Sequence, residues 1–525
     1  MKILSGCYDL TTNEYSDSSV GVYSFSDDSV ELYIFGSIYT GDAVNDGKKI
    51  MSLYREHGIG VTAFLSGSYI LLIYDFAVKT LRVFYDRATS PVAFYYTVTA
   101  GKIYMSTSLK DLLRKSAIER CLNEDVIEEF LLNGFIYGSE TLVKNVKKAQ
   151  AYHCLEIANG RLCEHKVEYP LKTVSPGQAL ETYAQTLDCA IIKTIGADKE
   201  VNFPLSSGYD SNYIAYVATE KAKRKANAFS VGGKRGKNEL PVVEENVKYY
   251  KNLELRSAIT NGNSLKNLPD IVMRLEGNVY ESGIFLQYEL MKLVSRSGAE
   301  KLICGECADQ VMNLYYHSQD RINPVRDDGG KPMYYEFSEY PYIFSSYLIL
   351  KKSGILANSF GIETLYPYLD EDFISVCAPL GPVSRKDKRV HVANCCGCLP
   401  PEIVKNMSKK GGSTDCRSLF DNDEEIKRFF RKIEKNRLFK ECSSYIFGND
   451  IFKKEKQTGV TLLKTKLRNI ILTVLRMKKD GPYFIEVKLR LYLCAAYLII
   501  FNELFIVRGG SDEKCKDIAF DDIIK

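Results

Sequence analysis

A short run of small and acidic residues at 205–211, L-S-S-G-Y-D-S, has the types and spacing most suited to chemistry. It lies between 201–205, which is typical of a strand, and 210–223, which is typical of a helix. A turn of small residues at a helix N-terminus exposes backbone N–H groups that suit phosphate or pyrophosphate. Gly208 lets the backbone approach the anion closely, and the hydroxyls of Ser206 and Ser211 can donate to phosphate oxygens.

Two acidic residues point to a divalent cation. Phosphate would repel Asp210 unless Mg²⁺ lay between them. A second glycine turn at 302–310, L-I-C-G-E-C-A-D-Q, follows an apolar strand end. Ligands of open α/β sheets bind at the carboxyl ends of the strands, so we expect Asp309 to supply a second carboxylate to the same metal. The plainer alternatives are a helix-capping turn at 205–211 and a helix-start acid at 309.

The segments around these turns alternate between strand and helix. Residues 227–231 are strand-like, and 239–250 are helical. This alternation predicts a parallel sheet with crossover helices. A further helical pattern covers 179–195, and the domain boundary is expected between 165 and 180.

The first 115 residues have a different sequence pattern. Apolar runs of strand length at 69–75, 81–85 and 92–96 are separated by short polar breaks. Such runs indicate hairpins packed into sheets. Residues 123–135 then read as a helix with acidic residues in its first turn.

Composition excludes several classes of protein. The chain has 525 residues, of which 45% are hydrophobic and 26% charged, so it can bury large cores. Its net charge of +4 is too small to make nucleic acid the main partner. The start lacks the apolar stretch of a signal peptide. The apolar run at 491–501 is too short to span a membrane and predicts a buried helix. Fifteen scattered cysteines indicate reduced thiols and a cytoplasmic location.

The order of motifs resembles the asparagine synthetase superfamily. Residues 206–211 resemble its S-G-G-x-D-S, and 305–310 resemble its G-E-G-A-D-E. Downstream, 366–370 resemble x-P-F-L-D, 399–403 resemble L-P-x-E-I, and 407–411 resemble R-x-K-x-G.

The resemblance extends in both directions. Residues 86–96 resemble a motif of the family's N-terminal amidotransferase-like domain, and 490–505 resemble its C-terminal helix. The implied architecture is a degenerate class II glutamine amidotransferase-like domain at 1–170, an α+β sandwich in αββα order. Residues 171–525 would form an α/β PP-loop ATP-pyrophosphatase domain, adenine nucleotide α-hydrolase-like, with a helical C-terminal part.

The resemblance also implies an activity and its residues. The protein would use ATP and Mg²⁺ to adenylate a carboxylate, release pyrophosphate and join the acyl group to an amine. Arg385 and Lys388 fall in the family's basic R-x-x-K stretch. The implied set is Lys409 and Glu276 for catalysis, Leu205, Ser206, Ser207, Gly208, Asp210, Ser211, Val231, Gly305 and Glu306 for ATP, and Asp210 and Asp309 for the metal.

Departures from the family pattern narrow the range of reactions that the protein could catalyse. Active members carry cysteine after the initial methionine as the nucleophile that hydrolyses glutamine, whereas Lys2 stands here, with Cys7 as the nearest thiol. The family's F-N-G-E segment reads F-G-S-I at 35–38. We therefore expect no glutamine hydrolysis. Leu365 and Gln310 replace a usual arginine and glutamate, which argues against plain aspartate as the substrate.

Loss of glutamine hydrolysis leaves several functions open. Two branches of the family share this loss: β-lactam synthetase-like enzymes and lasso-peptide cyclases, which form macrolactams. The alternatives are an ammonia-dependent asparagine synthetase and a non-catalytic scaffold. An RNA-modifying pyrophosphatase conflicts with the low net charge. The expected partners are a small-molecule or peptide carboxylate and amine, with a precursor peptide and a protease in the cyclase case, and neither nucleic acid nor membrane.

Two adjacent lysines test the mechanism that the resemblance implies. If Lys409 stabilises the departing pyrophosphate, Lys409→Met should lower kcat by about 10² to 10³ while the KM for ATP changes little, because the loss falls on the transition state. Lys410→Met should be nearly silent in the same pyrophosphate-release assay. The reverse pattern would shift the register of the loop by one residue.

Overall fold

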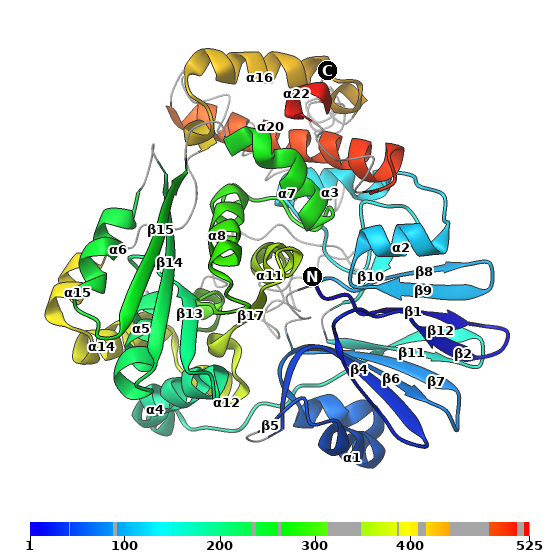
Figure 1. The fold of residues 1–525 in the computed structure, drawn as a ribbon, viewed down its shortest axis with the longest axis horizontal. Coiled ribbons are helices and arrows are strands. Elements are labelled where there is room, and N and C mark those ends of the chain that lie inside the picture. The colour runs from blue at the N-terminus through cyan, green and yellow to red at the C-terminus, as the bar shows by residue number, and fades with distance from the viewer. Residues whose placement is uncertain are drawn as a thin grey trace, which may run out of the picture.

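The computed structural model describes the chain apart from residues 41–42, 88–91, 151, 234–237, 261–263, 313–347, 386–387, 408–415, 442–481, 512–518 and 524–525. Two halves lie side by side, with mostly antiparallel sheets in the N-terminal half and a parallel sheet in the C-terminal half (Figure 1).

The N-terminal half contains two antiparallel sheets. One has the order β10-β8-β9-β1-β2, and the other has the order β12-β11-β7-β6-β4-β3 with β5 paired to β4. The strands are β1 Ser5–Asp9, β2 Glu14–Asp17, β3 Tyr23–Ser26, β4 Val30–Thr40, β5 Ala43–Val44, β6 Ser66–Asp75, β7 Thr80–Tyr85, β8 Tyr95–Thr99, β9 Lys102–Ser106, β10 Lys147–Lys148, β11 His153–Ala158 and β12 Arg161–Lys166.

Strand β6 shows why these sheets stack. Its successive side chains point to opposite faces. Ile70 and Leu72 join the cluster between the two sheets, whereas Leu71 and Ile73 join a second cluster with Ile50 of helix α1 (Gly47–His57). Helix α2 (Leu109–Ser116) contacts β8 and β9 of the other sheet. The order of layers is therefore the predicted αββα. The predicted boundary at 170 falls between β12 and helix α4 (Pro176–Ile195).

The C-terminal half begins with the predicted alternation of strands and helices. Strands β13 (Glu200–Pro204), β14 (Lys225–Gly233) and β15 (Leu253–Thr260) form a parallel sheet. Helix α5 (Tyr209–Tyr216) and a π-helical turn connect the first pair, and α6 (Leu240–Val247) connects the second. Strands β16 (Lys301–Ile303) and β17 (Glu363–Leu365) form a separate parallel pair, with β16 contacting β13.

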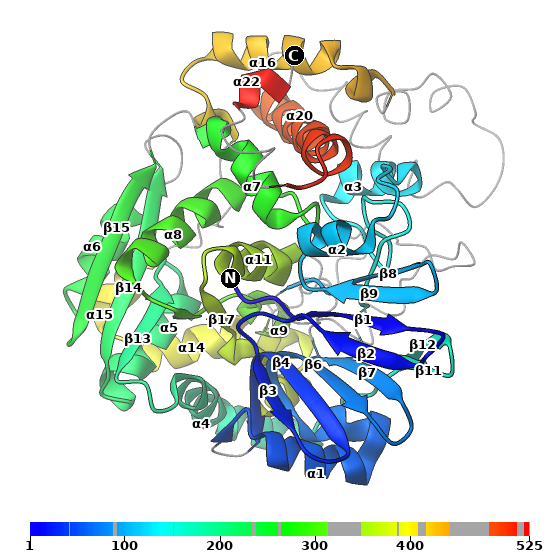
Figure 2. The same ribbon diagram turned by 45° about the vertical axis from the view of Figure 1, so that its right-hand side comes forward.

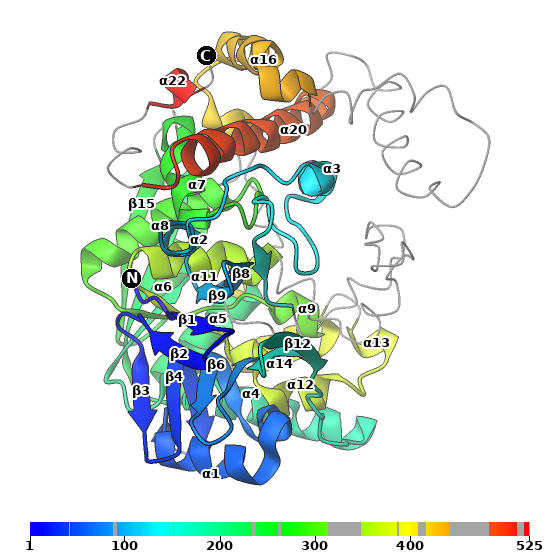
Figure 3. The ribbon, with the colours of Figure 1, turned by 90° about the vertical axis from the view of Figure 1, so that its right-hand side faces the viewer.

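Helices complete the C-terminal half. They are α7 Leu268–Leu275, α8 Ile284–Ser297, α9 Ala308–Met312, α11 Leu350–Ser359, α12 Glu371–Cys377, α13 Pro382–Arg385, α14 Arg389–Cys398, α15 Pro401–Asn406, α16 Asp423–Lys435, α20 Pro482–Phe501 and α22 Phe520–Ile523. Figure 3 shows α16 and α20 at the end of the molecule away from α1. Within the described chain, Leu489–Val507 is apolar and long enough to cross a membrane by length and composition, and 67% of it is buried in the protein.

The halves meet over a large contact. Helix α11 lies between the parallel sheet and the N-terminal sheets (Figures 1 and 2). At another point, helix α3 (Ile127–Asn133) ends at Gly134, whose carbonyl accepts the backbone N–H of Tyr280 at 2.6 Å. The neighbouring residues Phe135 and Val279 form an antiparallel bridge. Backbone pairing of this kind requires close approach of the two segments.

Gly134 allows a direct test of this contact. Its φ is +76°, and a Cβ there would lie 2.0 Å from the carbonyl oxygen of Tyr280. Gly298, which ends α8 at φ +79°, has nothing within 4 Å of its Cβ position. Both Gly→Ala changes incur the left-handed cost of about 1 kcal/mol. We expect Gly134→Ala to lose about 1–3 kcal/mol more, through overpacking, in urea unfolding. Equal losses of unfolding free energy in the two variants would show that the contact between the two halves accommodates a Cβ at this point without cost.

Candidate functional site

The predicted anion loop is a compact turn between β13 and α5. Leu205 continues the strand, since its N–H donates to the carbonyl of Phe229 at 2.9 Å. The Ser206 N–H donates to Ser211 Oγ at 3.1 Å, and the Gly208 N–H donates to Ser206 Oγ at 3.2 Å. The side chains of the serines thus hold the turn at the N-terminus of α5.

A carboxylate from another loop sits on this turn. Ser207 donates its N–H to Glu239 Oε2 at 3.0 Å and its hydroxyl to the same oxygen at 2.9 Å. Glu239 directly precedes α6. Donors that satisfy one anion oxygen in this way are the kind that a phosphate oxygen would use.

The two predicted metal ligands come together. Lys388 Nζ lies 2.6 Å from Asp210 Oδ2 and 2.7 Å from Asp309 Oδ1. Gly305 brings the second loop to the first, because its Cβ position is 3.6 Å from both Asp210 Cβ and the backbone nitrogen of Ser211. Carboxylates that share one ammonium lie close enough to share one metal ion.

The surroundings keep Asp210 ionised. Burial alone would raise its pKa, but the Lys388 ammonium and the nearby His391 ring outweigh this and bring the pKa of Asp210 down to about 2. The carboxylates also raise the pKa of Lys388 despite its burial. The Tyr368 hydroxyl donates to the backbone carbonyl of Asp210 at 2.9 Å. The site therefore keeps its charges at neutral pH.

His391 supports Asp210 from behind. Its side chain is buried, and Nε2 lies 3.4 Å from Asp210 Oδ1 without hydrogen-bond geometry. The rings of Tyr183, Tyr213 and Tyr368 surround the imidazole at centroid distances of 5.5–6.3 Å. His391 is therefore fixed in place against the carboxylate.

The donor set fits a hard cation. Mg²⁺ prefers oxygen ligands and is commonly bound by one or two carboxylates together with substrate phosphates. Asp210 Oδ1 is buried and has no hydrogen-bond partner within the described structure. No group of three or more metal-ligating side chains occurs among the described residues. Two carboxylates completed by phosphate oxygens are therefore the arrangement that these residues can offer.

The other predicted nucleotide residues occupy varied places. Val231 lies near the carboxyl end of β14 and packs partly buried against the core. Burial raises the pKa of the Glu306 carboxyl, and Cys304 and Lys352 are among its electrostatic neighbours. Cys307 occupies the third position of the glycine-rich motif with φ +68°, which explains why glycine suits this position. Lys409 and Lys410 lie outside the described residues.

The structure corrects the prediction for Glu276. Its carboxylate accepts the Ser108 hydroxyl at 2.8 Å and the Leu109 N–H at 2.7 Å. These donors begin helix α2 of the N-terminal half, and Figure 1 shows α2 and α7 well away from α5. Glu276 is a buried helix cap between the domains and does not join the Asp210 site. In the sequence, an acid at a helix end beside a glycine is compatible both with a catalytic residue and with a helix cap.

Two members of the site could not be predicted from the sequence. Glu239 stands between a strand-like and a helical segment, and His391 lies in a helix without a motif of its own. Nothing in their spacing marks them, because contact with 205–211 arises only through the crossover connections. Lys388 falls in the basic stretch noted in the sequence, and its ammonium reaches both carboxylates.

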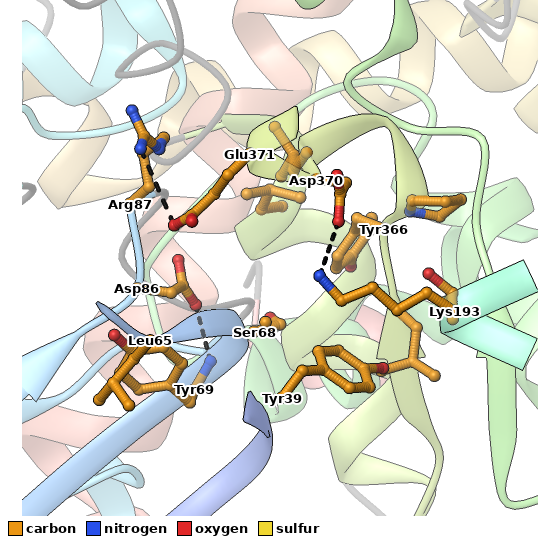
Figure 4. Close-up of a pocket in the computed structure, with 16 residues that line it drawn as sticks. Tyr39, Leu65, Ser68, Tyr69, Asp86, Arg87, Lys193, Tyr366, Asp370 and Glu371 are labelled. Carbon is orange, nitrogen blue, oxygen red and sulfur yellow. Dashed lines mark hydrogen bonds and ion pairs between the residues drawn. The ribbon is translucent and has the colours of Figure 1, made fainter. Parts of the chain in front are cut away.

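A cavity lies where the two halves meet, beside the segment 366–371 (Figure 4). On one side, Arg87 faces Glu371, with 3.8 Å between Nη2 and Oε1. On the other side, Lys193 pairs with Asp370 at 3.0 Å. The same segment carries Tyr368 to the backbone of Asp210. This wall therefore belongs both to the interdomain cavity and to the predicted site.

A second contact lies at the first residues of the chain. Lys2 Nζ pairs with Glu363 at 3.0 Å, and the Ser37 hydroxyl donates to the same carboxylate at 2.6 Å. The Lys2 N–H also donates to Asn358 Oδ1 at 3.2 Å. Side chains of the C-terminal half thus engage two of the positions, 2 and 37, that depart from the family's glutaminase pattern.

Family models match both halves. The asparagine synthase model covers residues 182–329, and the glutamine amidotransferase domain model covers 23–168. A Brassica oleracea asparagine synthetase (glutamine-hydrolysing) is 22% identical over 390 residues, covering 69% of this chain and 60% of that protein. An Arabidopsis thaliana counterpart is 24% identical, covering 66% and 55%. The chain thus spans about 60% of the length of the first of these curated relatives.

A solved structure titled as the allosteric regulatory enzyme of purine biosynthesis has 7% identity and a TM-score of 0.20, covering 49% of this chain and 65% of that one, too slight a likeness to bear on the fold.

The fold and site define a two-domain protein in which an amidotransferase-like αββα half abuts a parallel-sheet half with paired carboxylates. These matches support the asparagine synthetase superfamily for the chain, with an N-terminal half similar to a glutamine amidotransferase domain.

Glu371 predicts a pH dependence of stability. Burial raises its pKa to about 7, against the lowering effect of Arg87. A folded pKa above the unfolded value of 4.5 means that the native state holds the proton more tightly. The free energy of unfolding should therefore fall as pH rises from 4.5 to 7, and stay level above. Partial exposure reduces the effect to about 1–2 kcal/mol. Glu371→Gln should remove this fall in urea unfolding, and exposed Asp372→Asn should retain it.

Proposed function

We propose that the protein is an ATP-dependent, AMP-forming amide synthetase. It adenylates a carboxylate and couples it to an amine without hydrolysing glutamine, as a lasso-peptide cyclase or β-lactam synthetase-like enzyme does. The C-terminal half would have the PP-loop fold. The observation that carries this proposal is the meeting of Asp210 and Asp309 on one ammonium beside the turn at 206–211.

The proposed roles follow from position. The N–H groups and hydroxyls of Ser206, Ser207 and Ser211 would hold phosphate oxygens at the start of α5. Asp210 and Asp309 would hold Mg²⁺, which neutralises charge on the phosphates when it is bound. Fixed donors of this kind stabilise charge that grows on a leaving group without reorganising. Residues of the chain would thereby favour departure of pyrophosphate from the activated carboxylate.

The amine would come from the substrate. Lys2 and Ser37 both engage Glu363, so two of the departures from the glutaminase pattern are tied into the domain contact. Lys2 stands where active members carry the cysteine nucleophile, so this position supplies no thiol to attack glutamine. This supports an internal or separately bound amine. Free ammonia, as in an ammonia-dependent asparagine synthetase, is the competing source.

Paired substitutions test the shared metal. Asp210→Ala and Asp309→Ala should each abolish carboxylate-dependent pyrophosphate release, because one remaining carboxylate cannot hold the metal with the phosphates. The double variant should be no worse than either single variant, as expected for groups that act as a unit. Release of pyrophosphate from ATP, with mass analysis of the acyl product, is the measurement.

Asp198→Ala is the matched control, because Asp198 makes an exposed ion pair with Lys301 and should leave the rate unchanged. Full activity in either test variant would refute the assigned site. An amidated product that requires added ammonia would favour the asparagine synthetase alternative.

A further inference from the structure

We propose that two of the chain's own charges occupy the nucleotide site in the absence of ligand. The Glu239 carboxylate stands in for a phosphate oxygen, and the Lys388 ammonium stands in for the metal. Binding of ATP with Mg²⁺ must displace both, so the two residues set the threshold for loading the site. This inference rests on the proposed function and concerns regulation of the same site.

Glu239 is bound as an anion ligand would be. Its Oε2 accepts both donors of Ser207, at 3.0 Å from the nitrogen and 2.9 Å from the hydroxyl. No cation forms an ion pair with Glu239 in the part of the chain that the structure describes. Neutral donors of the anion loop therefore hold this carboxylate, and they are the donors that a phosphate would need. A phosphate and a carboxylate cannot share them, because like charges repel at this range.

Lys388 is bound as a cation ligand would be. Its side chain is 8% exposed, and its ammonium touches a carboxylate oxygen from each of two loops. The backbone there has φ +55°, which non-glycine residues rarely adopt. That conformation places Lys388 at the start of α14, with His391 one turn further on. A divalent cation between the same carboxylates would repel the ammonium.

The two stand-ins satisfy the donors and the carboxylates of the unliganded site. Negative Glu239 satisfies the donors of the turn, and positive Lys388 separates two carboxylates that would otherwise repel each other. A ligand must then compete with a tethered group, and its apparent affinity equals its intrinsic affinity multiplied by the fraction of molecules in which that group has moved away. Removal of the Glu239 charge should therefore raise the affinity for pyrophosphate, and removal of the Lys388 charge should raise the affinity for a divalent cation.

The first experiment measures inorganic pyrophosphate binding by calorimetry without divalent cations. Glu239→Gln keeps the shape and an acceptor for Ser207 but removes the charge. We expect at least about tenfold tighter binding than in the unaltered protein. Glu402→Gln, in the first turn of α15, is the control and should change nothing. Unchanged or weaker binding in Glu239→Gln would overturn the assignment and make Glu239 a support for the loop.

The second experiment measures Mn²⁺ binding by electron paramagnetic resonance without nucleotide. Lys388→Met should bind Mn²⁺ at least about tenfold more tightly than the unaltered protein, while Lys405→Met should not. If Lys388→Met fails to fold, Lys388→Gln supplies a neutral side chain that can still donate to the carboxylates. Weaker or equal Mn²⁺ binding in the folded variant would overturn the role of Lys388.

The outcomes separate this inference from the proposed function. If the unaltered protein binds ATP with Mg²⁺ and neither variant gains affinity, the inference fails and the proposed function stands. If neither the unaltered protein nor any variant binds ATP, pyrophosphate or Mn²⁺, both fail and the scaffold alternative gains. Tighter binding of pyrophosphate by Glu239→Gln and of Mn²⁺ by Lys388→Met supports the inference.

Discussion

Two carboxylates that approach one another need a cation between them, and this requirement organises the C-terminal half. Asp210 follows β13 and Asp309 follows β16, so both stand beyond the carboxyl ends of strands that contact each other from two parallel sheets. Repulsion between them at close range would amount to several kcal/mol at the dielectric of a protein surface. Lys388 removes this repulsion in the absence of ligand, and its place at the start of α14 fixes where the chain must return after α12.

The domain contact has a different physical basis. Glu276 places an anion on the N-terminus of α2, where unpaired backbone N–H groups favour negative charge. Its burial raises its pKa, yet the Leu109 N–H and the Ser108 hydroxyl satisfy its oxygens. A buried cap of this kind holds two domains at a fixed angle, because its hydrogen bonds tolerate little displacement. The amidotransferase-like half thereby positions α7 and the helices that follow it.

Most of the fold could be predicted from sequence, because periodicity reports which face of an element is buried. Residues 69–75 and 201–205 correspond to β6 and β13, and 179–195 falls inside α4. The motif at 206–211 and Asp309 were also predicted to meet, since the carboxyl ends of parallel strands share an edge. Glu276 was assigned wrongly, because its partner at α2 is more than 160 residues away. Glu239 and His391 were missed for the same reason: their partners are tertiary neighbours without a local signal.

Two residues beside the carboxylates adopt left-handed backbone, and one of them, Cys307, also departs from the family pattern. Cys307 adopts φ +68° at a glycine position, and Lys388 adopts φ +55°. Left-handed backbone persists in such residues only when surrounding contacts hold it there. Cys307 is buried within the second loop, and Lys388 is held by two ion pairs. Both strained residues flank the carboxylates, whereas Asp210 itself lies in an ordinary helical turn. The cost of preorganising the site therefore falls on the neighbours of Asp210, whose own backbone is ordinary.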